Sequence, residues 1–178
     1  MRLTPIKTVA DPTTAGDFCL RFSSVELLHL MRGINQTRQK VWKQQEDSFF
    51  DVATIEADGT TVETFGENKQ RIAMNYKGRW GYPPLVVTLA ETQEVLYLSN
   101  RSGNRPSHKS SALFFDLTID QCRKAGFRKV LLRGDTDFSS TEHPDRWDWD
   151  DVKFVLGFDA NQKLTAIADA AEEGPSQA

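Results

Sequence analysis

Short apolar runs separated by polar turns dominate the chain from residue 52 onward. Runs of this length, bounded by turn residues and rich in β-branched side chains, predict strands. The predicted strands span residues 52–58, 85–89, 95–98, 129–134 and 152–158. Only a short polar link, residues 91–94, separates the second run from the third. That spacing predicts an antiparallel hairpin.

A helical pattern of apolar residues precedes the strands. Ser23 and Glu26 form a capping-box motif, in which each side chain satisfies a backbone N–H at a helix start. Apolar residues then recur at helical spacing as far as Trp42, and Gly33 weakens this helix without ending it. Residues 1–22 carry two prolines and little periodicity, so we expect an irregular lead-in.

A second helix is expected between the third and fourth strands. Ser107 is a suitable N-cap, and Gly126 is a typical C-terminal stop. The apolar side chains of Phe115, Ile119 and Cys122 recur at the spacing of one helix face. An acidic, Trp-rich stretch at residues 143–151 predicts a short helix before the last strand.

The resulting order is three strands, a helix, a strand, a short helix and a strand. Three antiparallel strands followed by αβαβ is the order of the ribonuclease H-like mixed sheet, so we predict an α/β fold of that class. The domain organisation follows from this order. We expect an N-terminal lead-in and helix over 1–50, a partial core over 51–165 and a flexible tail over 166–178.

The composition suits one soluble domain. Of the 178 residues, 39% are hydrophobic and 26% are charged. No apolar run approaches the roughly 20 residues that span a membrane, and no secretory signal opens the chain. Cys19 and Cys122 are isolated from each other and from any zinc spacing, which predicts reduced thiols in a cytosolic protein.

Charge is unevenly distributed along the chain. Residues 101–133 hold eight Lys or Arg and two Asp or Glu, whereas residues 134–178 hold three and eleven. A basic block directly before an acidic block is compatible with a phosphate-facing surface beside a metal site. Ordinary solvated faces explain the same distribution equally well.

Two acidic residues lie where predicted strands end. Asp58 closes the first strand and Asp135 follows the fourth. Carboxylates at the ends of neighbouring strands can hold Mg²⁺, which prefers hard oxygen ligands and keeps water and phosphate oxygens in its shell. We predict that Asp58 and Asp135 meet and bind a divalent metal. The simpler interpretation is that both are turn residues, since Asp is common before Gly and Thr.

Two further motifs are weaker. Glu56-x-Asp58-Gly59-Thr60 is similar to the DxDGT motif of haloacid dehalogenase-like phosphatases, but Glu56 replaces their nucleophilic Asp and we reject that interpretation. The loop at residues 101–109 is basic and precedes a helix, a setting that suits DNA phosphates, although a solvated loop is the simpler interpretation. The predicted DNA contacts are Arg101, Asn104, Arg105, His108, Lys109 and Arg133.

The motifs together resemble a known family. Asp58-Gly59-Thr60, the string YKGRWGY at 76–82, the string NRSGNRPSH at 100–108 and the string LRGDTDFS at 132–139 look like bacterial insertion-sequence transposases of the DDE type. The resemblance covers residues 14–165. It implies a ribonuclease H-like core that transposes DNA with two Mg²⁺ or Mn²⁺ ions, with the first two catalytic aspartates at Asp58 and Asp135.

The resemblance also implies partners and a location. DNA, as transposon ends and target, is the expected partner, together with other transposase copies. We expect no membrane partner and a location in the bacterial cytosol, associated with the nucleoid.

One departure from the family pattern affects the predicted activity. The family's third carboxylate is a Glu on a helix beyond the fifth strand, and this chain continues for only 20 residues after Phe158. Glu172 and Glu173 are the late candidates, and neither is assigned the role. We therefore expect a truncated transposase that does not transpose DNA alone. The alternatives are a non-catalytic remnant that binds DNA or joins full-length transposase, and a stand-alone nuclease of the same fold.

Overall fold

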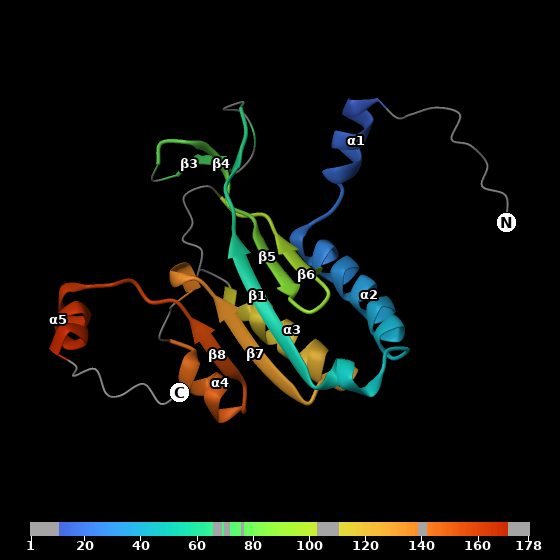
Figure 1. The fold of residues 1–178 in the computed structure, drawn as a ribbon. Helices are drawn as coiled ribbons and strands as arrows, with labels where there is room; N and C mark the ends of the chain where they lie inside the picture. Colours follow the sequence, from blue (N-terminus) through green and yellow to red (C-terminus); the bar gives the residue numbers. More distant parts are fainter. Residues whose placement is uncertain are drawn as a thin grey trace. The chain divides into compact units, whose positions relative to one another are not determined.

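The structure is a computed structural model that describes residues 11–65, 69, 72–75, 77–102, 111–138 and 142–170. The chain divides into two compact units, Met1–Gln45 and Glu46–Ala178, and each is described by itself (Figure 1). In the part of the chain that the structure describes, no helix is long and apolar enough to cross a lipid bilayer.

The first unit contains two helices, α1 (Pro12–Cys19) and α2 (Ser24–Trp42). The prediction of an irregular lead-in is wrong for residues 12–19. Asp11 caps α1 by accepting a hydrogen bond from the Thr13 backbone N–H, and Pro12 occupies the first turn, where its missing N–H costs nothing.

Helix α2 begins as the sequence predicts. Both halves of the capping box between Ser23 and Glu26 form. Gly33 does not end the helix, which continues for two more turns to Trp42. The local capping and propensity arguments were therefore sufficient for this element.

A five-stranded mixed sheet forms the centre of the second unit. Its order is β6-β5-β1-β7-β8, with β1 (Val52–Gly59) in the middle. β5 (Leu85–Leu89) pairs antiparallel with β1 and with β6 (Glu94–Ser99), which confirms the predicted hairpin. β7 (Lys129–Gly134) pairs parallel with β1 and with β8 (Lys153–Leu156). The mixed α/β class predicted from the sequence is confirmed.

Helix α3 (Ser111–Ala125) packs against the sheet (Figure 1). Alternate residues of β1, Ala53, Ile55 and Ala57, are buried beside it. Phe115 and Ile119 of α3 are buried as well, as the helical spacing predicts. Burial of alternate strand residues leaves the intervening side chains of β1 on the opposite face of the sheet.

The short helix α4 (Pro144–Trp149) matches the acidic, Trp-rich stretch identified in the sequence. The ring of its buried Trp147 meets the ring of Phe115 edge to face, with centroids 5.5 Å apart. Asp116 accepts hydrogen bonds from Trp147 Nε1 and from both terminal nitrogens of Arg146, each at 3.0 Å. These contacts hold α4 to α3.

A second sheet and a C-terminal helix were not predicted. A second sheet, with strand order β2-β4-β3, is built from β2 (Val62–Glu63), β3 (Ala73–Met74) and β4 (Trp80–Tyr82). Helix α5 (Gln162–Ala170) occupies part of the expected tail, and the Asn161 side chain caps it through the Leu164 N–H. The first residues of the expected tail, 166–170, are thus helical, whereas the flexibility of the tail stays a prediction. Residues 171–178 lie outside the described residues.

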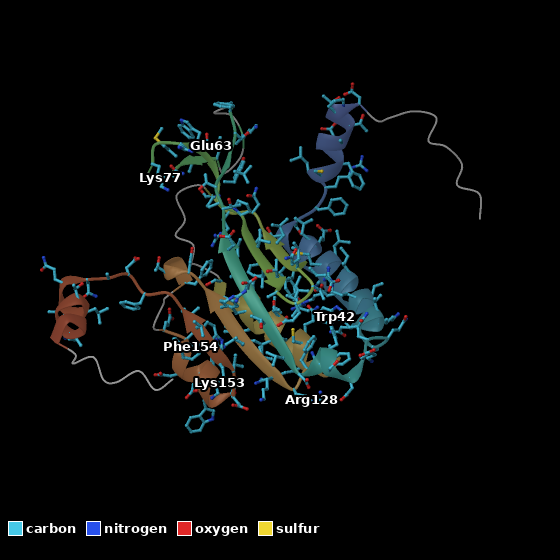
Figure 2. All side chains as sticks on the ribbon, viewed as in Figure 1. Trp42, Glu63, Lys77, Arg128, Lys153 and Phe154 are labelled. Carbon is cyan, nitrogen blue, oxygen red and sulfur yellow. The ribbon has the colours of Figure 1, made fainter. Side chains whose placement is uncertain are left out.

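The amino ends of β1 and β7 are joined by an ion-pair cluster. Arg128, labelled in Figure 2, lies just before β7. It forms ion pairs with Asp47 and Asp51. Its backbone N–H also donates to the Phe50 carbonyl at 2.8 Å. These contacts connect the segment before β1 to the start of β7, at the end of the strands opposite Asp58 and Asp135.

Candidate functional site

Asp58 and Asp135 occupy equivalent positions on neighbouring parallel strands. Ala57 of β1 is the register partner of Gly134 of β7, and each aspartate is the next residue along its own strand or the turn that follows. Neighbouring strands lie about 4.8 Å apart, so their ends carry the two side chains to the same edge of the sheet. The carboxyl ends of parallel strands are where open α/β sheets place ligands.

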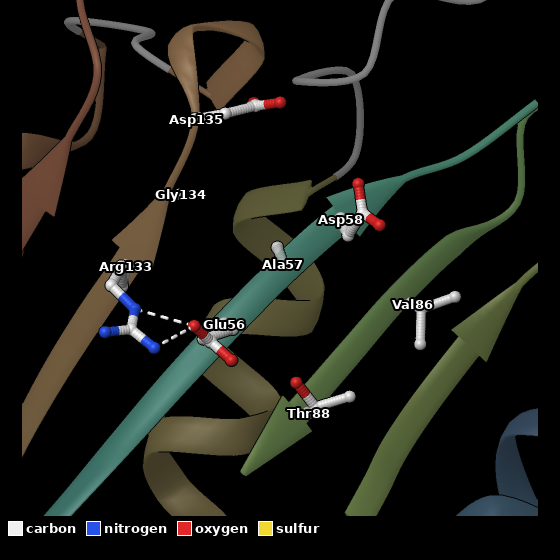
Figure 3. A pocket seen from close by; sticks show the side chains of 8 residues that line it. All are labelled: Glu56, Ala57, Asp58, Val86, Thr88, Arg133, Gly134 and Asp135. Carbon is white, nitrogen blue, oxygen red and sulfur yellow. Dashed lines mark hydrogen bonds and ion pairs between the residues drawn. The ribbon is translucent and has the colours of Figure 1, made fainter. Parts of the chain in front are cut away.

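Both aspartates line one pocket, of about 600 Å³ (Figure 3). Its floor comes from β1, β5 and β7, and both carboxylates are exposed. Glu56, Asp58 and Arg133 share the face of the sheet that the alternating burial leaves open. The structure thus places both residues on one pocket, whereas the prediction that they meet and bind a divalent metal stays a prediction.

An ion pair that the sequence analysis did not anticipate forms the side of the pocket. Glu56 and Arg133 are register partners on β1 and β7. Arg133 donates from Nε to Glu56 Oε1 at 2.6 Å, and its Nη2 bonds the same oxygen (Figure 3). Nη1 takes no part in this pair. The pair neutralises one of the three carboxylates in the pocket and holds a guanidinium two residues from Asp135.

Two close approaches at Gly157 and Gly134 shape the turn that carries Asp135. A Cβ on Gly157 would lie 2.9 Å from the Thr136 backbone nitrogen and 3.1 Å from the Asp135 carbonyl carbon. A Cβ on Gly134 would lie 3.1 Å from the Phe138 Cβ. Glycine at these positions lets the chain after β8 pack directly on the backbone of the site.

The family profile described as transposase DDE domain group 1 matches residues 9–178. The chain belongs to this family of DDE transposase domains. A cryo-EM structure of a piggyBac transposase synaptic complex with hairpin DNA is similar to 69% of the chain, at 11% identity and a TM-score of 0.38. The chain spans 27% of that protein. No curated protein sequence matches the chain.

The donor set of this DDE domain fits a divalent metal. Two exposed carboxylates line one open pocket, and Mg²⁺ is commonly bound by one or two carboxylates with water and phosphate oxygens completing its shell. The described residues contain no cluster of three or more His, Cys, Asp or Glu that could hold a metal. Glu56 is paired with Arg133, so Asp58 and Asp135 are the pocket carboxylates that would hold an ion.

The residues predicted to contact DNA differ in how exposed they are and in whether the structure describes them. Arg101 is only 5% exposed, and its Nε donates to the Pro83 carbonyl at 2.9 Å. Arg101 is thus buried beside the backbone, and its role as a DNA contact stays a prediction. Arg133 is exposed in the pocket. Four of the predicted contacts lie outside the described residues: Asn104, Arg105, His108 and Lys109.

Proposed function

We propose that this chain is part of the ribonuclease H-like catalytic core of a DDE transposase from a bacterial insertion sequence. Its chemistry would be metal-dependent cleavage and transfer of a DNA strand during transposition. The juxtaposition of Asp58 and Asp135 at register-equivalent strand ends, in one open pocket, supports this proposal most directly. The β6-β5-β1-β7-β8 order, antiparallel on one side of β1 and parallel on the other, also supports it.

Asp58 and Asp135 would hold Mg²⁺ or Mn²⁺ between them. Such ions activate the attacking oxygen and stabilise the leaving oxygen in phosphoryl transfer. Arg133 would contribute a cation for a neighbouring backbone phosphate, using the nitrogen that Glu56 does not occupy. Glu56 would hold this guanidinium in one orientation, because a single carboxylate oxygen accepts hydrogen bonds from both Nε and Nη2 of Arg133.

The competing proposal is a non-catalytic domain that binds DNA or joins other transposase copies. It needs no metal, and the exposed guanidinium of Arg133 in the pocket is a cation that would serve it. A third carboxylate is part of the DDE pattern that the sequence resembles. Only two pocket carboxylates, Asp58 and Asp135, are given a catalytic role in this proposal, so we expect this chain not to transpose DNA by itself.

Metal binding tests the site before any DNA is involved. Mn²⁺ titrated into the purified chain should bind, and Asp58→Asn or Asp135→Asn should each weaken the binding at least tenfold. Asp159→Asn, at an exposed aspartate that does not line the pocket, is the matched control. Unchanged Mn²⁺ affinity in both site variants would refute the proposed metal site.

Cleavage and binding assays then separate the two proposals. Supercoiled plasmid is incubated with the chain and Mg²⁺, and retardation of a labelled duplex is measured in parallel. Nicking that Asp58→Asn abolishes supports catalysis, whereas retardation without nicking supports the non-catalytic alternative. Robust strand transfer by the purified chain would refute the expectation that it cannot transpose DNA.

A further inference from the structure

The small sheet β2-β4-β3 projects from the strand end that carries Asp58 (Figure 1). It is inserted between β1 and β5, whose terminal residues Gly59 and Leu85 are register partners. Both connections of the insertion therefore leave the main sheet beside the candidate site. We call residues 60–84 the arm.

The hydrogen-bond register places four large side chains on one face of the arm. Val62 pairs with Tyr82, and Met74 pairs with Trp80. Paired residues share a face, and Trp80 and Tyr82 are two residues apart on β4, so all four lie on the same side. Val62 is 50%, Met74 48% and Trp80 40% exposed. We call this side the aromatic face.

The opposite face of the arm has a different chemistry. It carries Gly81 and Glu63, and Arg79 forms an ion pair with Glu63 there. A Cβ on Gly81 would collide with the Val62 carbonyl, so β2 lies close against β4. The Asn75 side chain closes the β3–β4 turn by accepting from the Lys77 and Arg79 N–H groups, each at 3.0 Å. The arm is thus a defined small sheet with one apolar side.

Charge favours a nucleic acid as the occupant of the aromatic face. The arm has two Lys and two Arg against two Glu, a net charge of +2 in a chain whose net charge is −3. An exposed tryptophan on a sheet can stack unpaired bases, and cations elsewhere on the same segment can meet the phosphates of that strand. An interface with another protein would not require this excess of cations.

We propose that the aromatic face of the arm stacks unpaired bases of a DNA strand next to the candidate site. The inference rests on the proposed function, because that function brings a DNA strand to Asp58. Trp80 supplies the main stacking surface, and Met74 and Val62 extend it. Stacking of this kind tolerates any base sequence, since every base has a π-face.

The test measures binding of a fluorescent 12-nucleotide oligo-dT to the full chain by anisotropy, with no divalent metal present. Trp80→Ala should weaken binding by roughly 5- to 150-fold, the range observed when one aromatic stacking partner is removed. Trp80→Phe should restore most of the affinity. Trp149→Ala, at a tryptophan that is 91% exposed on α4, is the matched control and should bind like the unmodified chain.

A second variant tests the arm as a whole. Gly81→Ala should separate β2 from β4 and weaken oligo-dT binding without lowering the thermal midpoint of the main sheet. Equal affinities of Trp80→Ala and Trp149→Ala would overturn the inference. So would a loss of self-association in Trp80→Ala at unchanged DNA affinity, because the face would then bind protein.

The metal-free assay separates this inference from the proposed function. Oligo-dT binding that depends on Trp80, with no Mg²⁺-dependent nicking, would reject catalysis and leave the stacking face in place. Nicking that depends on Asp58, with binding that ignores Trp80, would reject the stacking face alone.

Discussion

Removal of the Asp116 carboxylate should loosen α4 from α3 by a measurable amount. Asp116 is 37% exposed and accepts three hydrogen bonds, one of them from the indole N–H of Trp147, which is 4% exposed. Asp116→Ala leaves that N–H buried without an acceptor, which costs about 1–3 kcal/mol. The exposed ion pair with Arg146 adds about 0.2–1 kcal/mol. We expect a loss of about 2 kcal/mol.

Asp116→Asn separates the two contributions. The Asn carbonyl keeps an acceptor for Trp147 Nε1 while the charge is removed, so the expected loss is below about 1 kcal/mol. Asp120→Ala is the matched control on the same helix, because Asp120 forms only an exposed pair with Lys124. Its expected loss is about 0.3–0.5 kcal/mol.

Equilibrium urea denaturation measures these differences, and a loss of 2 kcal/mol corresponds to a thermal midpoint lowered by about 4–8 °C. The ordering Asp116→Ala, then Asp116→Asn, then Asp120→Ala is the expected result. If Asp116→Ala falls within 0.5 kcal/mol of Asp120→Ala, a margin of about the additivity error, the indole hydrogen bond does not stabilise the fold.

Three further predictions concern the site and the core. Gly157→Ala should destabilise the chain by about 1–3 kcal/mol, because the new methyl group displaces the turn that carries Asp135. The same displacement should weaken Mn²⁺ binding. Urea denaturation measures the first effect and Mn²⁺ titration the second. Arg133→Ala should reduce the slope of log K against log salt for duplex binding by about 1, whereas Lys129→Ala, at the far end of the same strand, should not. Burial raises the pKa of Cys122 to about 12, so a thiol reagent at pH 8 should label only Cys19 in the folded chain. Unfolding should become easier as the pH rises from about 8.5, the ordinary pKa of a thiol, because only the unfolded thiol ionises there.

Local signals in the sequence were sufficient for elements whose formation depends on near neighbours. The capping box at Ser23 and Glu26 located the start of α2, and Gly126, with a φ of 109°, closes α3 as expected. The same kind of signal stands at Asp11, where an N-cap followed by proline begins α1. Short strands such as β2 and β3 have only two residues each, too few for a periodic pattern.

The burial and pairing of charged side chains could not be predicted from the neighbouring sequence. Arg101 looks like a loop cation in the sequence, yet the structure places it in the interior against Pro83, 18 residues away. In the sequence, Glu56 is only the residue that replaces the nucleophilic Asp of the phosphatase-like motif. In the structure it pairs with Arg133, which lies 77 residues further along the chain. Whether a charged side chain faces solvent or a partner depends on segments that the local pattern does not specify.

The sequence by itself determined the five strands of the main sheet and helices α2, α3 and α4, and it placed Asp58 and Asp135 at the ends of two of those strands. Alternation of apolar residues and capping chemistry act within a few residues, so they can be read along the chain. Only the tertiary structure decided that Ala57 pairs with Gly134, and therefore that the two aspartates line one pocket. Strand register depends on packing between distant segments, and many registers satisfy the same local pattern.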